Sequence, residues 1–284
     1  MRHRFDVRVG PAGFRIGADW RAPIAQLETL YRDYPKPLDG IPDFTVRLSA
    51  TRPWRRWIRP SVAIAGDYML PEAAPLPLAQ SLLAAEMAMN LQMALGWRRH
   101  LLLHASVVER TGRALIMTGE SGAGKSTLAA LLAARGWRLM GDEFALLHPG
   151  SGELHAFPRL VSLKNESVAA MAAEATTARW GPLLAGTPKG DIRHLVPSDA
   201  AIAAMDLSAT PVLLLFPRFG FAPAERAVPP SEAFVRLTQA STNYTALGEA
   251  GFTALTRLIA DVPAIAIDYP GGEAALRQIE RLAP

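Results

Sequence analysis

The 284-residue sequence contains no cysteine. This absence excludes disulfide bonds, thiolate zinc sites and cysteine nucleophiles together, and it suits the reducing cytoplasm, where we expect the protein to be. Hydrophobic residues make up 50% of the chain and charged residues 20%, which is typical of globular proteins and unlike disordered chains. A chain of this length is able to bury one large core or two modest ones.

Lysine is scarce. Of the 30 basic residues, lysine occurs only at positions 36, 125, 164 and 189, so the other 26 are arginines, and the formal net charge is a mild +4. An ammonium group is a compact point charge, whereas a guanidinium group is a planar fork. A lysine in such an arginine-rich chain therefore indicates a position that favours the smaller cation.

Long apolar runs are also missing. No such run follows the basic residues at 1–6, so we expect no signal peptide. The nearest approach to a membrane span is residues 73–97, but Pro75 and Pro77 interrupt it and polar side chains are scattered through it. A span needs about 20 mostly apolar residues. We therefore expect a buried helix that begins near Leu78, and no transmembrane segment.

Two regions of the chain differ in their pattern. Residues 1 to about 70 hold three short segments typical of strands, at 5–9, 44–48 and 62–65, and a helical spacing of apolar residues at 24–34. These segments predict a small N-terminal α+β domain, which with its connecting helix occupies residues 1–97.

From residue 98 the pattern becomes an alternation of strands and helices. The predicted strands are residues 101–108, 114–118, 137–140, 212–216 and 264–267. The predicted helices are residues 125–135, 232–240, 249–259 and 273–282. Short, wholly apolar strands are expected where a sheet is covered on both faces. Residues 98–284 are thus predicted to form a layered α/β domain.

A complete phosphate-binding motif lies within that domain. Residues 119–126 read G-E-S-G-A-G-K-S and match G-x-x-x-x-G-K-[ST], the P-loop or Walker A motif, in full. An apolar strand leads into the motif and a strongly helix-forming segment leads out of it. The candidate nucleotide-binding residues are Gly119, Glu120, Ser121, Gly122, Ala123, Gly124, Lys125, Ser126 and Thr127.

The chemistry of phosphate binding explains the spacing of this motif. The glycines let successive backbone N–H groups point at phosphate oxygens, and the helix N-terminus adds partial positive charge. Lys125 is placed to reach the β- and γ-phosphates, and the Ser126 hydroxyl to ligate Mg²⁺. We expect a nucleoside triphosphate, ATP or GTP, with Mg²⁺, and the motif also leaves pyrophosphate open as the donor.

Carboxylates for the chemistry follow the motif. Fifteen residues separate Ser126 from Asp142, enough for a helix and a short strand that returns to the same sheet edge. Asp142 and Glu143 are therefore expected beside the γ-phosphate, where a P-loop enzyme needs a metal ligand and a group that activates the nucleophile. We interpret the rival Asp268 as a strand-ending turn residue. His104, inside a predicted strand, is either a core histidine or a site residue.

Three of these segments together resemble the bacterial HPr kinase/phosphorylase family. They are His104-Ala-Ser, the P-loop, and Arg138-Leu-Met-Gly-Asp142-Glu143. The chain is also similar to the subgroup called HPr-kinase-related kinase A at residues 157–165, 187–190 and 243–252, and in its N-terminal part at 42–47 and 54–59. Three of the four lysines, at 125, 164 and 189, fall within the family-like motifs.

This resemblance implies the P-loop kinase fold shared with phosphoenolpyruvate carboxykinase, and it implies roles for single residues. Asp142 would be the general base that takes the proton of the acceptor hydroxyl. Glu143, His104 and Ser126 would organise metal, water and phosphate, with Ser126 and Glu143 as the metal ligands. Lys189 would lie near the transferred phosphoryl group. The resemblance also suggests an assembly of several copies.

The sequence departs from the family at places that bear on the substrate. Glu143 stands where the family has an aspartate, Ala105 where it has a glycine, and the second family signature is reduced to Lys189-Gly-Asp-Ile-Arg193. We therefore expect an acceptor other than HPr and no phosphorylase activity. The resemblance suggests a serine or threonine of a peptide or protein as the acceptor.

The functional expectation is thus an ATP- or GTP-dependent kinase that requires Mg²⁺ and acts on a hydroxyl group. One alternative is a non-catalytic, nucleotide-dependent binding module in which residues 182–198 act as a mobile lid. Another is a small-molecule phosphotransferase of the carboxykinase type. The acid pair favours catalysis, because a switch has no need of a base.

One further segment mixes arginine with tryptophan, Arg52-Pro-Trp-Arg-Arg-Trp-Ile-Arg-Pro60. Such a segment is able to contact an anionic membrane or a nucleic acid. The alternative is a loop whose tryptophans pack under the first sheet while its arginines face water. We expect this second arrangement, and no nucleic-acid partner.

Overall fold

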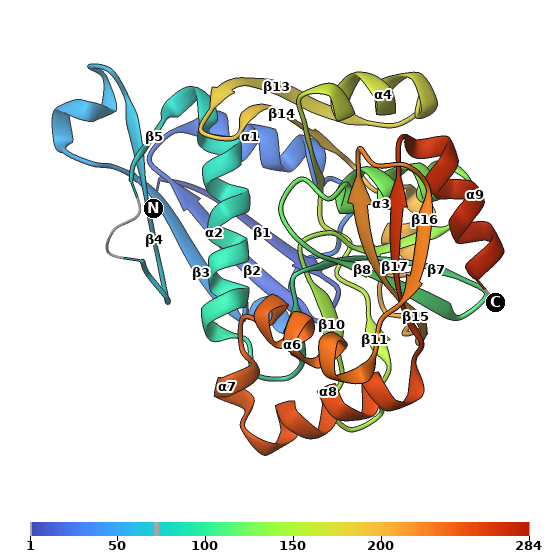
Figure 1. The fold of residues 1–284 in the computed structure, drawn as a ribbon. Coiled ribbons are helices and arrows are strands. Elements are labelled where there is room, and N and C mark those ends of the chain that lie inside the picture. The colour runs from blue at the N-terminus through green and yellow to red at the C-terminus, as the bar shows by residue number, and fades with distance from the viewer. Residues whose placement is uncertain (1, 71–73, 284) are drawn as a thin grey trace.

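Four β-sheets and the helices around them make up the computed structural model within residues 2–70 and 74–283, the part of the chain that it describes. The protein is a mixed α/β structure (Figure 1). A five-stranded sheet lies in the N-terminal part, a six-stranded sheet in the C-terminal part, and two small three-stranded sheets accompany them.

The N-terminal sheet has the strand order β1-β2-β3-β4-β5 and is antiparallel except where β2 and β3 run parallel. Its strands are β1 (His3–Val9), β2 (Ala12–Ala18), β3 (Phe44–Ala50), β4 (Ser61–Gly66) and β5 (Leu76–Pro77). Helix α1 (Arg21–Leu30) joins the parallel pair, and α2 (Ser81–Gly96) packs on the sheet through β3 and β4. The three strands expected here are confirmed, and β2 was not foreseen.

The two helices of this region differ from expectation in their ends. The helix expected at 24–34 begins earlier, at Arg21, and ends at Leu30. The helix expected from Leu78 is confirmed, with a 3-10 turn (Leu78–Gln80) leading into α2. None of the helices within residues 2–70 and 74–283 has the length and apolar character that a membrane span requires.

The six-stranded sheet has the order β16-β17-β15-β8-β7-β9. Its strands are β16 (Ala224–Ala227), β17 (Ala264–Tyr269), β15 (Thr210–Phe219), β8 (Arg113–Thr118), β7 (Ala105–Arg110) and β9 (Arg138–Gly141). Strands β17, β15 and β8 are parallel, and β7 runs antiparallel to both β8 and β9. Consequently β8, β9, β15 and β17 all end at one sheet edge, where β7 begins.

Helices cover both faces of this sheet (Figure 1). One face packs against α3 (Lys125–Ala134) and α9 (Gly272–Leu282), and the other against α6 (Pro230–Ala240) and α8 (Glu249–Asp261), to which α7 (Tyr244–Leu247) leads. In β8, Leu115 and Met117 contribute to the first core, whereas Ala114 and Ile116 contribute to the second. This double burial explains why the strands are apolar throughout.

The two small sheets complete the fold. One contains β11 (Leu154–His155), β10 (Ala145–Leu147) and β6 (Leu101–Leu103), and the other contains β12 (Val161–Lys164), β14 (Gly190–Leu195) and β13 (Trp180–Thr187). Helices α4 (Glu166–Glu174) and α5 (Asp199–Ala203) lie in their connections. The segment 182–198, considered as a mobile lid, lies largely in the paired strands β13 and β14.

The strand expected at 101–108 was wrong in one respect. It is divided at His104 into β6 and β7, which belong to different sheets. The backbone N–H of His104 donates to the carbonyl of Ala240 at 2.8 Å, and its carbonyl accepts from the Thr118 hydroxyl at 2.9 Å. These bonds hold His104 outside both ladders, so its side chain is exposed instead of lying within a strand.

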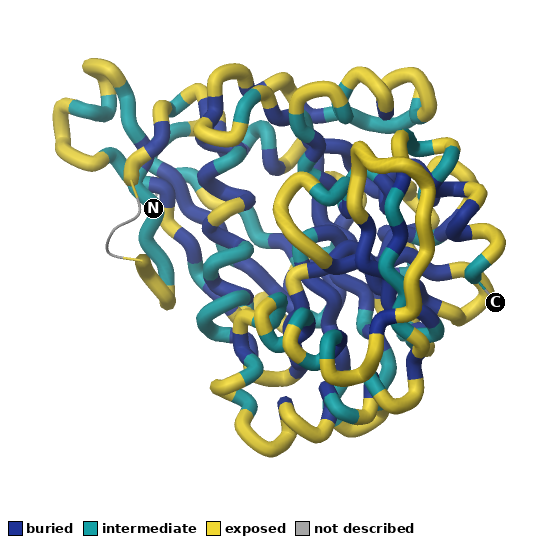
Figure 2. Tube along the Cα trace, in the orientation of Figure 1, coloured by how far each residue is buried: buried dark blue, intermediate teal, exposed yellow. Residues whose placement is uncertain are grey.

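The core beneath the N-terminal sheet extends across residue 97. It includes Val46 and Met89 from before that position, and Phe144, Phe157 and Ile192 from after it. Figure 2 shows buried stretches in both parts of the molecule. Residues 1–97 and 98–284 therefore share a hydrophobic core, and the division into two domains stays a prediction.

The expected packing of the Arg52–Pro60 tryptophans was wrong. Trp54 and Trp57 are 51% and 74% exposed instead of lying under the sheet. Residues Pro53–Arg56 form a 3-10 turn beyond the end of β3, and the nearby Trp20 instead packs against the core.

Candidate functional site

The P-loop connects β8 to α3 at the sheet edge where four strands end. Gly122 and Gly124 have φ values of 86° and 91°, a region that favours glycine. A Cβ atom on Gly124 would overlap the hydroxyl of Tyr269 in β17. That hydroxyl donates to the carbonyl of Ala123 at 2.8 Å, so the end of β17 supports the shape of the loop.

Lys125, the first residue of α3, is buried with its ammonium group inside the loop. Its Nζ donates to the carbonyls of Gly119 at 2.7 Å and Glu120 at 2.9 Å. Burial lowers the pKa of Lys125, and the charges of Asp142 and Glu143 oppose that shift. The motif lysine and the acid pair, predicted separately, thus lie in one electrostatic environment.

Asp142 directly follows β9 and is only 1% exposed. Its Oδ1 accepts a hydrogen bond from the Ser106 hydroxyl of β7 at 2.5 Å, and its buried Oδ2 has no partner among the residues that the structure describes. Burial raises the pKa of Asp142 and the neighbouring Glu143 adds to the rise, whereas Ser106 and Ser126 oppose it. A buried carboxylate oxygen without a partner is rare in folded proteins and calls for an explanation.

Glu143 follows Asp142 in the chain but differs from it in exposure and in the direction of its pKa shift. It is partly exposed, its φ is 83°, and its Oε2 lies 3.4 Å from Nε2 of His104. The hydrogen bond from His104 is the main cause that lowers the pKa of Glu143 to about 2, and Arg159 and Lys164 contribute through their charges. The two adjacent acids therefore have pKa values shifted in opposite directions, a common arrangement where acid–base roles are divided.

Three residues at this site were not assigned a role from the sequence. Ser106 is a hydroxyl in an otherwise apolar strand, and that contrast was the available signal. Lys164, at the end of β12, was noted only as one of the few lysines, and its charge acts on both Lys125 and Glu143. Arg159 lies within the family-like segment 157–165, but its influence on Glu143 follows only from the folding of distant segments.

Among the described residues, no hydrogen bond or ion pair joins the acid pair to Lys189, a predicted site residue, or to Asp268, the rival acid that was not assigned to the site. Lys189 is exposed on the turn between β13 and β14, and no hydrogen bond or ion pair of the described residues joins its side chain to the P-loop or to Asp142. Asp268 lies inside β17 instead of in a turn, so that part of its interpretation was wrong. Its carboxylate is occupied by Arg218 at 2.9 and 2.5 Å.

The donors at this edge fit Mg²⁺. Among the described residues, no three His, Asp or Glu side chains are grouped to enclose a metal. Mg²⁺ usually keeps several waters and binds through one or two carboxylates together with substrate phosphates. The Ser126 hydroxyl, the Glu143 carboxylate and the unpaired Oδ2 of Asp142 are oxygen donors of the required kind.

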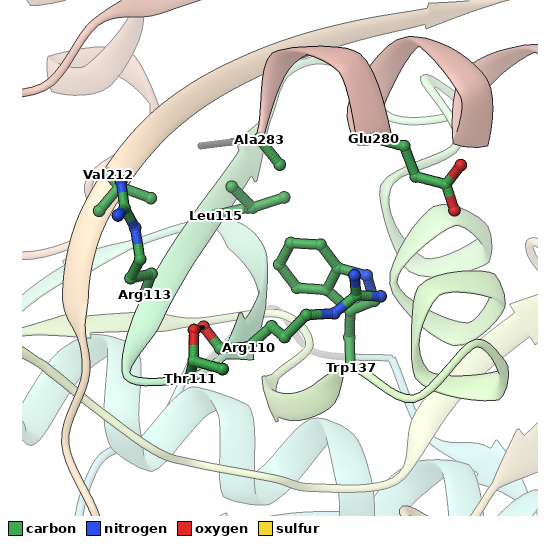
Figure 3. A pocket seen from close by; sticks show the side chains of 8 residues that line it. All are labelled: Arg110, Thr111, Arg113, Leu115, Trp137, Val212, Glu280 and Ala283. Carbon is green, nitrogen blue, oxygen red and sulfur yellow. Dashed lines mark hydrogen bonds between the residues drawn. The ribbon is translucent and has the colours of Figure 1, made fainter.

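A separate pocket lies at the opposite end of the sheet. Figure 3 shows it beside the start of β8, with the guanidinium of Arg110 over the ring of Trp137 at 4.4 Å from the centroid. Arg113 and Glu280 also line it. It shares no residue with the P-loop edge, and the candidate site is therefore defined by its chemistry and not by the depth of a pocket.

Comparisons with known proteins give two similarities. A model of the family described as SynChlorMet cassette protein ScmC matches residues 79–215, which include the P-loop and the acid pair. Among solved structures, the chain is similar to the Hpr(Ser) kinase/phosphatase from Coxiella burnetii, with 16% identity and a TM-score of 0.28, over 64% of this chain and 96% of that one. A search of curated proteins found no match.

Proposed function

We propose that this protein is a Mg²⁺-dependent kinase that transfers the γ-phosphoryl group of ATP or GTP to a serine or threonine hydroxyl of a peptide or protein. The observation that carries the proposal is the convergence, at one sheet edge, of a P-loop with a buried lysine and two adjacent carboxylates with opposite pKa shifts. The resemblance of the sequence motifs to HPr kinases supports the same reaction class.

The nucleotide phosphates would bind in the loop between β8 and α3. Backbone N–H groups at the start of a helix favour anionic ligands. Lys125 donates to two loop carbonyls, and phosphate oxygens are stronger acceptors for its charge. We therefore expect Lys125 to exchange these carbonyls for phosphate oxygens when a nucleotide binds.

Ser126 and Glu143 would hold Mg²⁺ beside the phosphates. When bound, the ion would neutralise charge on the transferred group. The low pKa of Glu143 keeps this carboxylate ionised at neutral pH, as a metal ligand requires. His104 would keep Glu143 oriented through their contact at 3.4 Å.

Asp142 would act as the general base. The acceptor oxygen attacks the γ-phosphorus while the bond from that phosphorus to the β–γ bridging oxygen breaks, and Oδ2 of Asp142 takes the hydroxyl proton. Ser106 holds the other carboxylate oxygen at 2.5 Å. The raised pKa of Asp142 makes it a stronger base than an exposed carboxylate. The role of Lys189, which would be to stabilise charge on the transferred phosphoryl group, rests only on the resemblance to HPr kinases.

The test uses γ-labelled ATP with Mg²⁺, a lysate of the source organism as the pool of acceptors, and four proteins: wild type, Asp142→Asn, Lys125→Ala and Asp268→Asn. We expect the wild type to label a macromolecule and Asp142→Asn to lose transfer while keeping its affinity for a fluorescent ATP analogue. Lys125→Ala should lose both binding and transfer.

Asp268→Asn is the matched control, because it makes the same change at the same sheet edge in a carboxylate that is already paired with Arg218. It should retain transfer. If Asp142→Asn transfers label as well as the wild type, Asp142 is not the base. If the wild type binds nucleotide but labels no macromolecule, the kinase proposal is wrong and a nucleotide-dependent binding module becomes the better account.

A further inference from the structure

Residues 52–60, between β3 and β4, form a loop that we call the Arg–Trp loop. It contains four arginines, two tryptophans and one isoleucine, and no acidic residue. Trp54, Trp57 and Ile58 are 51%, 74% and 65% exposed. The loop projects from the upper left of the molecule in Figure 1, and Figure 2 shows it as mostly exposed.

The arginines of this loop are not neutralised by carboxylates. Within the described part of the chain none of Arg52, Arg55, Arg56 and Arg59 takes part in an ion pair, although arginine ion pairs occur elsewhere in the protein. Arg55 and Arg56 donate to backbone carbonyls instead. The nearby carboxylate of Asp19 accepts from the backbone N–H of Ala50. The loop therefore presents four positive charges that leave room for an anionic partner.

The exposed side chains stand on a backbone that is held in place. The hydroxyls of Thr51 and Ser61 lie 2.8 Å apart across the base of the loop. Trp20 donates from Nε1 to the Arg56 carbonyl at 3.0 Å, and Pro60 accepts from the Leu78 N–H at 3.0 Å. The exposure of the tryptophans is therefore a property of an ordered turn, and binding would require little ordering of the backbone.

The combination of side chains selects the kind of partner. Tryptophan has an apolar ring with one polar N–H and is enriched at membrane–water interfaces, and arginines next to such residues are attracted by anionic lipids. A protruding loop suits a deformable surface that accepts apolar tips between charged headgroups. A nucleic acid would need free ring faces for stacking. Here the guanidinium groups of Arg52 and Arg56 lie 5.3 and 5.8 Å from the ring centroids of Trp54 and Trp57.

We propose that the Arg–Trp loop docks this protein on an anionic membrane surface, with Trp54, Trp57 and Ile58 inserted among the headgroups and the arginines at headgroup level. This proposal does not depend on the kinase activity.

The chain that follows the Arg–Trp loop and β4 leads to the β13–β14 hairpin. Pro60 bonds to Leu78, and Gln80, two residues further, donates to the carbonyls of Ala185 and Gly186 in β13 at 3.4 and 3.3 Å. Leu183 and Lys189 are exposed on this hairpin.

The test measures co-sedimentation with vesicles of phosphatidylcholine alone or mixed with phosphatidylserine. We expect the full chain to bind the mixed vesicles only, and salt to weaken binding. Trp54→Ala/Trp57→Ala should lower partitioning at least tenfold. Each arginine near an anionic surface contributes about fivefold, so Arg52→Gln/Arg59→Gln should lower it roughly 25-fold.

The matched control is Phe252→Ala on α8, which removes an aromatic side chain of 51% exposure outside the loop and should leave binding unchanged. Nucleotide binding by every variant confirms that it is folded. If the wild type binds neither kind of vesicle, or if the double tryptophan variant binds as well as the wild type, the proposal is wrong. The proposal is also wrong if the loop binds single-stranded DNA or polyglutamate and no vesicles.

Discussion

Two buried polar groups of this protein are built in opposite ways. At the P-loop edge, Oδ2 of Asp142 has no hydrogen-bond partner among the described residues, and Nζ of Lys125 donates to two loop carbonyls. On helix α2, the Glu86 carboxylate accepts hydrogen bonds from Arg159 and from the Tyr31 hydroxyl. Arg159 also donates to Asn90, and Nε of Arg159 has no partner among the described residues. The charged groups of the second cluster are bound mainly to one another, whereas the first cluster contains polar atoms that are available to bind a ligand.

The difference shows how a structural network and a candidate site can be told apart. A buried ion pair that is broken on one side destabilises the fold strongly. A site instead tolerates unpaired atoms and shifted pKa values because a ligand completes it. Breaking the network of Glu86 should therefore affect mainly the stability of the fold, with a smaller effect on Glu143, whose pKa the charge of Arg159 helps to lower. Changes in the group around Asp142 should affect mainly the reaction.

The largest expected effect comes from Asp142→Asn. Removal of a general base lowers the rate by about 10²- to 10⁴-fold, and the free energy of unfolding should not fall, because the buried carboxylate is poorly paired. The rate of label transfer and the urea midpoint of the same preparation test this prediction. If the variant unfolds at a lower urea concentration than the wild type, Asp142 stabilises the fold, as the Glu86 network does.

Arg159→Met should have the next largest effect, and it should lower mainly the stability of the fold instead of the rate of transfer. It leaves Glu86 charged and buried, which destabilises a protein by about 3–5 kcal/mol. Urea unfolding measures the loss. The double variant Glu86→Gln/Arg159→Met is the control and should recover much of it, because no charge is left unpaired. If Arg159→Met unfolds like the wild type, the closed network contributes little to stability.

A third buried group sharpens the comparison, because it is closed and still able to titrate. His100 accepts from Trp97 Nε1 at 3.0 Å and lies 2.9 Å from Nδ1 of His155. Burial, followed by the charges of His155 and His148, lowers the pKa of His100 to about 3. Between its unfolded pKa, about 6.5, and this value, the unfolded chain holds a proton that the folded chain does not.

Stability should therefore be lost as the pH falls from about 6.5 towards 3, with a slope of up to about 1.4 kcal/mol per pH unit. Urea unfolding at pH 7 and pH 5 measures this loss, and His100→Gln should reduce the slope. An identical pH dependence of wild type and variant would show that other groups cause it.

The smallest expected effect concerns the contact of the P-loop with the side chain of Tyr269. Tyr269→Phe removes the bond to the Ala123 carbonyl, which is worth about 1 kcal/mol, so nucleotide affinity should fall by about fivefold at most. Titration with a fluorescent nucleotide measures the change. A loss as large as that of Lys125→Ala would mean that β17 does more than support the loop.

Local patterns predicted the core of the candidate site well. The P-loop between β8 and α3 and the acid pair after β9 are confirmed in position, because the motif and the strand–helix–strand spacing are encoded within some 30 consecutive residues. The apolar strands at 212–216 and 264–267 are confirmed as well, because each is a short apolar run of the kind found in a sheet covered on both faces. The roles of the site residues stay predictions.

The remainder depended on contacts between distant segments. The segment 101–108 is divided at His104 because β6 pairs in one sheet and β7 pairs in another. No local sequence pattern indicates this division. Lys164 and Arg159 reach Glu143 through charge across space, and the strands β13 and β14 are obscured by proline, glycine and irregular register. Trp54 and Trp57 are exposed, although they were expected to pack under the sheet.

The hydroxyl of Tyr269 has a consequence for the order of events during synthesis. It bonds to Ala123, which precedes it by 146 residues. Ribosomes add about 5–20 residues per second, so roughly 7 to 30 seconds pass between the emergence of the phosphate motif and that of the strand that supports it. A nascent chain thus carries a complete motif well before it has a finished binding loop, and nucleotide is expected to bind only after β17 has entered its sheet.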